Sequence, residues 1–578
     1  MDPGLEEAIL RTPPGAEIEA VALLRPGHPL PGALRIIATF GNIVTCRVPS
    51  GGVRAMRAHP AVESLKAARL VQSAMAYAVT SNAPIDARPV ARRRGSDDAG
   101  GRGVIVGALD WGCDVAHPAF RRADGGTRLL ALWDQRGSST DPANPYGYGH
   151  IFDRARIDRA LATGDPYGDL GYHPAIADPF GHGAHGSHVL SIAAGSTSAP
   201  AGAAGVAPAA DLVFVHLATG ILPETSHLGD SVRILEGIDF IRRLAGTAPW
   251  VINLSLGRTG GDHSGRSLVE MAMDFVVEEG PGHAISLSGG NYYDKTLHAQ
   301  GIVEAGRAMT LEWRIPPDDP TTNELEIWYS GRDALRLELR PPNAREAIAI
   351  ELGDRVAIES GERLIGRAYH RRLEPITHDN HIDIFLDPAA PPGAWHVTLI
   401  GRDVVDGRFH AWIERDSAVP GAQSHFAPEI SSPRSTIGTI ATGYRTIVAG
   451  AADTRWGTPT IAPFCSAGPT RDGRVKPDLL APGVAVVAAR STPAGGLPGS
   501  GGVTTYSGTS MAAPHVTGAI ASLFSAAPRK LTASETRALL LGSADDVPGL
   551  DPERAGDGLL NIRAALAALR AVFNETRG

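Results

Sequence analysis

From residue 103 onward the chain contains short, continuous apolar runs that end in glycine or a small polar residue. These runs are VIVGALD, DLVFVHL, WVINLSL, HAISLSG and RTIVAGA. Runs of this kind are typical of strands buried on both faces of a parallel sheet. Amphipathic, helix-like stretches separate them, so the pattern predicts an α/β fold with a doubly wound, mainly parallel sheet. Its ligand site is expected at the carboxyl ends of the strands.

Between Asn291 and about residue 432 apolar and polar residues alternate instead with a period of two. Eight segments show the alternation: MTLEWRI, ELEIWYS, LRLELRP, RVAIESG, LIGRAYHR, HIDIFLD, AWHVTLIG and RFHAWIER. Such alternation predicts strands with one buried face. We therefore expect an all-β, jelly-roll sandwich inserted into the α/β domain.

Residues 18–71 form a third region with a mixed pattern. EAVALLR, LRIIATF and IVTCRVP favour strands, VRAMRAHPAV favours a helix, and VESLKAARLV is interpreted as a closing strand, which predicts an α+β unit. A stretch with Pro, Gly and little periodicity then predicts a linker. The predicted division is an N-terminal unit at 1–75, a linker at 76–102, the first part of the α/β domain at 103–300, the β insertion at 301–428 and the second part of the α/β domain at 429–578.

Composition narrows the function classes. The 578 residues include 54 basic and 62 acidic ones, a formal net charge of −8, so no nucleic-acid partner is expected. Three widely separated cysteines exclude a disulfide framework and a CxxC motif. No basic N-terminal region precedes an apolar run, and no stretch approaches 18 apolar residues, so we expect no signal peptide, no membrane span and a cytoplasmic location, with secretion by another route left open.

Two segments place a reactive side chain at the end of a predicted strand or on a predicted helix. Asp110 ends the run VIVGALD, where a turn or capping aspartate is the simpler interpretation. The segment GHGAHGSHV carries His182, His185 and His188 at spacing i, i+3, i+6, which would bring them to one side of a helix. A zinc cluster is an alternative, but HExxH, HxxEH and a nearby cysteine are all missing from the sequence, so a single histidine base fits better.

The strongest segment is YSGTSMAAPHVTGAIASLF, in which Ser510 falls at the start of an apolar helix. Unpaired N–H groups and the positive end of the helix dipole would favour an anion developing there, although a serine N-cap would satisfy the same position. Pro514 is expected to lie within the first turn, where proline is tolerated.

In the order Asp, His, Ser, these segments resemble the subtilisin-like serine peptidases. The segments GVAPAADLVFVHL, VINLSLG, SLSGGN, APFCSAGPTRDGRVKPDLLAPG and GDGLLNIRAAL resemble that family as well. Together the matches cover about residues 100–295 and 430–570. The resemblance implies a subtilisin-like fold and a serine endopeptidase that works through an acyl-enzyme. A catalytically silent subtilase-fold protein that binds peptides or regulates a partner is the alternative.

Carried over residue by residue, the resemblance implies Ser510 as nucleophile, His185 as general base and Asp110 as the group that orients the imidazole. His182 is a minor alternative for the base. Asn291 would donate its amide to the oxyanion together with the Ser510 N–H. The peptide or protein substrate would pair with two segments, which are Ser255, Leu256 and Gly257, and Ser288, Gly289 and Gly290.

The resemblance also extends to the other two regions. The N-terminal unit resembles the family's propeptide, an intramolecular inhibitor, which implies a zymogen cleaved between Val71 and Gly103. The β insertion resembles that of a subgroup of bacterial subtilases and is expected to rigidify the body or screen substrates. No cofactor is expected in the chemistry, whereas structural calcium is an option whose ligands the spacing does not identify.

Overall fold

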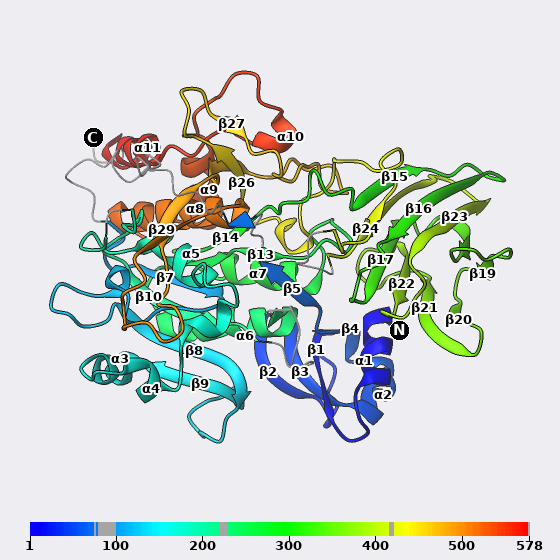
Figure 1. The fold of residues 1–578 in the computed structure, drawn as a ribbon, viewed down its shortest axis with the longest axis horizontal. Coiled ribbons are helices and arrows are strands. Elements are labelled where there is room, and N and C mark those ends of the chain that lie inside the picture. The colour runs from blue at the N-terminus through cyan, green and yellow to red at the C-terminus, as the bar shows by residue number, and fades with distance from the viewer. Residues whose placement is uncertain (74–76, 79–99, 201, 219–228, 416–420, 576–578) are drawn as a thin grey trace.

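The computed structural model describes residues 1–73, 77–78, 100–200, 202–218, 229–415 and 421–575. Most of the predicted linker, 76–102, lies outside these residues. An α/β unit and a β-sandwich lie side by side, and the N-terminal unit contacts both (Figure 1). Within the described ranges, no helix is long and apolar enough to cross a membrane.

The central sheet has parallel strands in its middle, as the apolar runs predict. The parallel strands are β28 (Leu479–Pro482), β26 (Ile447–Asp453), β14 (His283–Ser288), β12 (Trp250–Leu254), β7 (Ile105–Asp110), β10 (Asp211–His216) and β8 (Leu129–Ser138). Antiparallel partners are β9 (Tyr148–Asp153) on β8 and β27 (Thr460–Ile461) on β26. Every residue of β7 and β12 is buried, because helices cover both faces.

The helices divide between the two faces of the sheet. One apolar core holds side chains of α5 (His185–Ala194), α8 (Thr509–Ala526), α9 (Ala533–Leu541) and α11 (Ile562–Glu575). The opposite core holds side chains of α6 (Ser231–Ala245) and α7 (Leu268–Glu278). Three shorter helices, α3 (Arg154–Leu161), α4 (Pro166–Leu170) and α10 (Pro552–Ala555), lie at the periphery. This two-sided covering is the doubly wound arrangement expected from the sequence.

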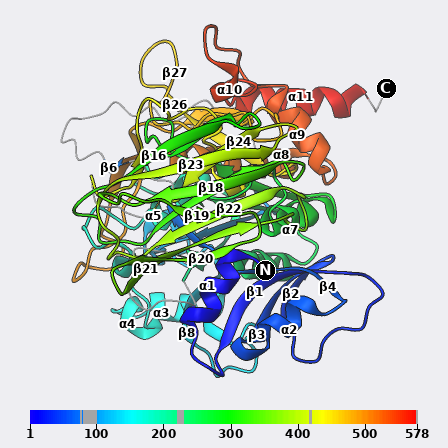
Figure 2. The ribbon, with the colours of Figure 1, turned by 90° about the vertical axis from the view of Figure 1, so that its right-hand side faces the viewer.

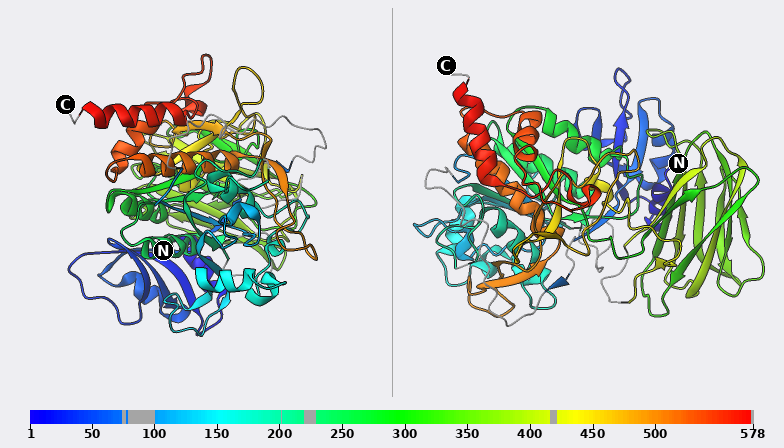
Figure 3. Two further views of the ribbon diagram at one scale, coloured as in Figure 1. Left: turned by 90° about the vertical axis from the view of Figure 1, so that its left-hand side faces the viewer. Right: turned by 90° about the horizontal axis from the view of Figure 1, so that it is seen from above.

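The insertion is a sandwich of two antiparallel sheets around its own apolar core (Figure 3). One sheet has the order β15 (His298–Ile302), β24 (Arg408–Ile413), β17 (Asn323–Tyr329), β22 (Asn380–Leu386), β21 (Arg363–Arg371), β20 (Arg355–Ser360). The other has the order β19 (Ile348–Ile350), β18 (Ala334–Arg340), β23 (Gly393–Asp403), β16 (Ala308–Ile315), β25 (His425–Phe426). All eight predicted segments are strands. Three further strands, β15, β19 and β25, were not predicted, because they are too short to show a clear alternation of apolar and polar residues.

The N-terminal unit packs a four-stranded sheet on the helices of the α/β unit. Its elements are α1 (Pro3–Arg11), α2 (Val53–Ala58) and the sheet β2 (Arg35–Phe40), β3 (Ile43–Pro49), β1 (Glu17–Leu24), β4 (Val62–Ala67). Val21 and Phe40 join the core beneath α6 and α7. Within this contact the buried Arg47 donates to both carboxylate oxygens of the buried Glu236 at 2.8 and 3.0 Å.

The predicted closing strand VESLKAARLV is wrong as a single element. β4 ends at Ala67, and after Ala68 the chain leaves the sheet as a separate strand, β5 (Leu70–Ser73). The cause is Arg69, whose guanidinium donates to Glu324 at 2.7 Å and Asp383 at 3.1 Å, both in the sandwich. Local periodicity carries no information about partners so distant in sequence.

Helix α1 attaches the N-terminal unit to the sandwich (Figure 2). Arg355 of β20 donates to Glu6 at 2.9 Å. Tyr369 of β21 donates its hydroxyl proton to Glu7 at 2.6 Å, and Arg367 pairs with the same carboxylate at 3.3 Å. Helix α1 was not predicted from the sequence, although it begins with an Asp N-cap followed by proline.

Candidate active site

Asp110 and His185 form a buried hydrogen-bonded couple at the carboxyl end of the central sheet. Asp110 is the last residue of β7, and its Oδ1 lies 2.7 Å from His185 Nδ1. The same oxygen accepts the Trp111 N–H at 2.7 Å, which fixes the carboxylate. His185 Nε2 has no hydrogen-bond partner within the described residues. The couple therefore orients the ring so that Nε2 is left for another group.

Close packing at Gly186 sets the position of that histidine. His185 is the first residue of α5, and the following N–H, that of Gly186, donates to Trp111 O at 2.8 Å. A Cβ at Gly186 would lie 2.5 Å from the Phe214 ring and 2.8 Å from Trp111 O. Only glycine fits here, so the sequence pair His-Gly brings the start of α5 against the end of β7.

Ser510 is the second residue of α8 and is fully buried. Gly508 before the helix has φ +156°, and its N–H donates to Gly483 O at 2.8 Å. Ser510 Oγ donates to the backbone carbonyl of Ser255 at 3.1 Å. Helices α5 and α8 pack on each other, and Val189 and Met511 share a small apolar cluster near their first turns. The His185 and Ser510 ends of the two helices therefore lie on the same side of the sheet.

The expectation that Pro514 lies within the first turn of its helix is wrong. The helix starts at Thr509, so Pro514 is its sixth residue and removes the N–H that would bond to the Ser510 carbonyl. Ser255 Oγ donates to that carbonyl at 2.9 Å instead. Asn253 in turn donates to Ser255 Oγ at 2.9 Å. The Ser255 side chain, which follows β12, thus replaces the missing helical hydrogen bond at the Ser510 carbonyl.

The amide of Asn291 is oriented by Thr509. Asn291 Oδ1 accepts from the backbone N–H and from the hydroxyl of Thr509, both at 3.0 Å. Thr509 Oγ1 also accepts the Gly290 N–H at 3.2 Å. Fixing the oxygen turns the amide NH2 of Asn291 away from Thr509. Sequence analysis did not single out Thr509, although it lies inside the motif SGTSMAAPHV.

The two predicted substrate segments follow neighbouring strands. Leu109, Leu254 and Leu287 are paired across β7, β12 and β14, so Asp110, Ser255 and Ser288 all lie at the same sheet edge. Gly289 is held by its N–H to Ala449 O at 3.0 Å. Gly290 has φ +105°, and a Cβ there would lie 2.6 Å from the Tyr292 ring. The backbone of this segment is therefore fixed, as a binding edge requires.

The chain's own N-terminal segment pairs with this edge. β5 lies antiparallel between β11 (Gly229–Asp230) and β13 (Leu256–Gly257). Farther on, β6 (Tyr77–Ala78) pairs antiparallel with β30 (Val503–Ser507), which leads into α8; β30 also pairs with β29 (Val486–Ala489). Strands on both sides of Ser510 thus already hold an extended peptide. β11 was not predicted as a strand that binds a peptide. It has only two residues, and the second of them is the N-cap of α6, so the sequence shows no strand pattern there.

The three histidines do not form a metal site. His182 is exposed and precedes α5, so the expected common helix face does not exist. His188 is buried, packs against the Tyr506 ring at an interplanar angle of 42° and contacts Val486 O through Nε2 at 3.1 Å. Burial, together with the charge of His185, lowers the pKa of His188 to about 3. In the described part of the chain, one group of side chains could hold a metal ion, and it lies in the sandwich.

A subtilase family model matches residues 101–311 and 423–561. The chain belongs to the subtilase family. This confirms the resemblance seen in the sequence. The chain is similar to the extracellular protease of Xanthomonas campestris pv. campestris, with 37% identity over 91 residues, 16% of each chain. It is also similar to the serine protease AprX of Bacillus subtilis, with 40% identity over 108 residues, 18% of this chain and 24% of AprX. The matches thus span a quarter or less of these two relatives.

Solved structures resemble the subtilase chain over more of its length. The Clostridium perfringens CspB protease has a TM-score of 0.68 at 24% identity, covering 81% of this chain and 95% of that one. Fervidolysin from Fervidobacterium pennivorans, titled a keratinolytic enzyme related to subtilisin, has a TM-score of 0.50 at 16% identity, covering 96% and 61%. At these identities the likeness shows a shared fold.

Proposed function

We propose that this subtilase is a serine endopeptidase that is made as a self-inhibited zymogen. Ser510 Oγ attacks the carbonyl carbon of the scissile peptide bond, and its proton passes to His185 Nε2. The Nδ1–H of the imidazolium donates to Asp110, whose carboxylate compensates the new positive charge. The protonated ring then gives the proton to the leaving amine, which leaves an acyl-enzyme for water to hydrolyse. The Asp110–His185 couple with its unpaired Nε2 is the observation that carries this proposal.

Stabilisation of the oxyanion is assigned to Asn291 and to the Ser510 N–H. The orientation of the Asn291 amide by Thr509 supports this role. Ser510 lies in the first turn of α8, where backbone N–H groups have no intrahelical acceptor and the helix dipole is positive. Donors that are fixed before the reaction need no reorganisation when the charge develops.

The inhibitor is the N-terminal unit, and its cleavage site is proposed to be one of the bonds between Ser73 and Tyr77. The pairing of β5 with β13 before this interval and of β6 with β30 after it supports the assignment. A substrate peptide would use the same edges by β-augmentation. The proposed cleavage site between Ser73 and Tyr77 lies within the longer interval, Val71 to Gly103, that was expected from the sequence.

We assign the sandwich the role of holding the inhibitor. We also propose that this sandwich is a jelly roll with the hairpin β20–β21 added, which the strand orders β15-β24-β17-β22 and β16-β23-β18-β19 support. Ion pairs from Arg69 and α1 to this unit support the holding role. The chemistry requires no cofactor in this scheme, and structural calcium stays a prediction.

The test is labelling by a fluorophosphonate, which reacts with an activated serine, combined with cleavage of a fluorogenic peptide. Wild-type protein should label and turn over, and Ser510→Ala should do neither. Ser525→Ala, which changes a half-buried serine near the other end of the same helix, is the matched control and should behave as wild type. If processed wild-type protein neither labels nor cleaves but binds peptide, the catalytically silent alternative is correct.

A further inference from the structure

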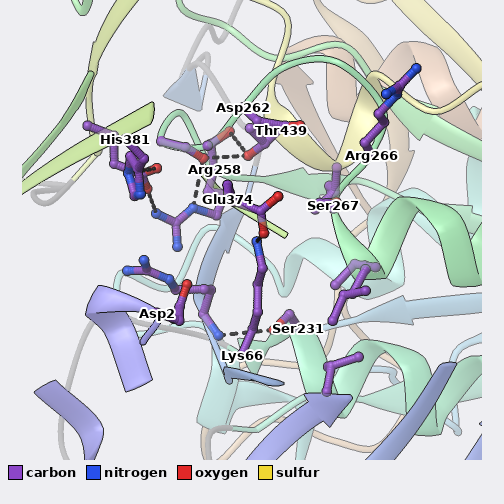
Figure 4. Close-up of a pocket in the computed structure, with 18 of the residues that line it drawn as sticks. Asp2, Lys66, Ser231, Arg258, Asp262, Arg266, Ser267, Glu374, His381 and Thr439 are labelled. Carbon is purple, nitrogen blue, oxygen red and sulfur yellow. Dashed lines mark hydrogen bonds and ion pairs between the residues drawn. The ribbon is translucent and has the colours of Figure 1, made fainter. Parts of the chain in front are cut away.

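A cavity of about 100 Å³ lies where the three units of the chain meet (Figure 4). Asp2 and Lys66 of the N-terminal unit, Arg258 of the α/β unit, and Glu326 and His381 of the sandwich line it. None of the proposed catalytic residues lines it. Charged side chains from all three units therefore meet at this cavity.

His381 is the unusual feature of this cavity. Its side chain is 2% exposed, and neither ring nitrogen makes a hydrogen bond within the described residues. The ring stacks on Trp328 with centroids 4.0 Å apart, and Nε2 lies 3.2 Å from Glu326 Oε2. Nε2 thus has the Glu326 carboxylate beside it, whereas Nδ1 has no partner within the described residues. Leaving a buried ring nitrogen unpaired is costly.

Glu326 and Asp383 bring two carboxylates to the same place. They are direct cross-strand partners on β17 and β22, and His381 lies two residues before Asp383 on the same face. One donor atom from each of the three residues lies within 4.8 Å of the others. Asp383 Oδ1 is buried and unpartnered, like the histidine nitrogens.

The charges of this buried cluster do not balance. Two guanidinium groups face four carboxylates: Arg69 pairs with Glu324 and Asp383, and Arg258 pairs with Glu324, Glu326 and Glu414. Counted as fully ionised, and with His381 neutral, these six groups have a formal charge of 2 − 4 = −2. Asp2 and Arg371, which also act on His381, are paired with each other and cancel. Uncompensated buried charge is strongly unfavourable, and a divalent cation would remove the excess.

We propose that Glu326, His381 and Asp383 bind a divalent transition-metal ion of the zinc class, with water from the cavity completing its coordination. One imidazole nitrogen and two carboxylate oxygens form a donor set that suits Zn²⁺, whereas Ca²⁺ and Mg²⁺ prefer oxygen ligands alone.

The free and occupied oxygens fit this role. Asp383 Oδ2 accepts from Arg69 at 3.1 Å, which leaves Oδ1 for the metal. Glu326 Oε1 accepts from Arg258 at 3.1 Å and Oε2 from Trp328 Nε1 at 3.1 Å, so Oε2 would be the metal ligand and would keep the indole as its hydrogen-bond donor. Such outer hydrogen bonds orient metal ligands. Because Arg69 directly precedes β5 and Arg258 directly follows β13, the ion would stabilise the junction that leads into the cleft.

The test uses the full chain with Ser510→Ala, which keeps it uncleaved. Protein stripped with EDTA is dialysed against Zn²⁺, Mn²⁺ or Ca²⁺, and bound metal is measured by mass spectrometry together with Tm. We expect about one Zn²⁺ per chain with a raised Tm, and no retained Ca²⁺. His381→Gln should retain at least tenfold less zinc. His370→Gln, at another buried histidine on the adjacent strand, should retain it fully.

Zinc below a tenth of an equivalent in the parent protein would overturn the proposal. So would equal zinc content and an equal Tm shift in His381→Gln, which would mean adventitious surface binding. If near-UV circular dichroism shows that His381→Gln is misfolded, Glu326→Gln replaces it, with the same loss expected and the same retention contradicting the site.

Discussion

The catalytic apparatus and the surface that docks the N-terminal unit both bury polar groups, but they arrange them differently. At the proposed active site each proposed function depends on one group, such as the Asp110–His185 couple or the Asn291 amide, that neighbouring hydrogen bonds hold in place. The docking surface instead spreads ion pairs over α1, β1, β3 and Arg69. Single substitutions should therefore affect turnover far more than inhibition.

The largest effect on turnover among these predictions is expected for Asn291→Ala. Loss of one oxyanion donor should lower kcat by about 10²- to 10³-fold with KM little changed, because the amide acts on charge that develops in the transition state. The measurement is steady-state cleavage of a peptide by processed protein. A variant with an unchanged kcat would show that Asn291 is not an oxyanion donor.

Arg47→Ala tests the strongest single contact of the docking surface. It leaves Glu236 buried without its bidentate partner, a loss of about 2 kcal/mol or more, which corresponds to roughly 30-fold faster fluorophosphonate labelling of the processed complex. Arg35→Ala, which breaks an exposed pair with Glu17, is the control and should have no effect. Equal rates for both variants would mean that Arg47 does not hold the inhibitor.

Ser255→Ala probes a contact that belongs to the scaffold of the active site. It leaves the Ser510 carbonyl without the donor that replaces the N–H missing at Pro514, which should lower the free energy of unfolding by about 1–3 kcal/mol. Adding Pro514→Ala restores a helical N–H and should recover most of that loss. Strictly additive effects of the two substitutions would contradict this compensation.

A pH dependence of stability is expected from Asp230, which caps α6 beside β5. Burial, followed by the charge of Glu19, raises the pKa of Asp230 from 3.8 to about 7. The folded protein thus binds more protons than the unfolded chain between about pH 4 and 7, so this contribution to stability falls as pH rises through that range. Asp230→Asn keeps a capping side chain and should flatten the dependence of Tm on pH in uncleaved protein. An unchanged pH profile would contradict the assignment.

Much of the scaffold could be predicted from local pattern. The apolar runs ending at Asp110, Ser255 and Ser288 identify strands whose ends meet, because the carboxyl ends of adjacent parallel strands share one edge. Alternation with a period of two located the eight main strands of the sandwich. Both signals are properties of the strands themselves, so no knowledge of distant partners is needed.

The parts that could not be predicted depend on contacts between distant segments. Arg69 and Asp383 are 314 positions apart, and Ser255 and Ser510 are 255 apart. The departure of β5 from the N-terminal sheet follows from the first contact, and the tolerance of Pro514 in the second turn of α8 follows from the second. Neither leaves a periodic signal in the sequence.

The most direct test of a self-inhibited serine peptidase is the intact mass and N-terminal sequence of the purified full-length chain. Wild-type protein should separate into two fragments at a bond between Ser73 and Tyr77, while Ser510→Ala purified in parallel should remain a single chain. Cleavage at the same bond in Ser510→Ala, or a wild-type enzyme that is fully active with its N-terminal unit still covalently attached, would contradict the account.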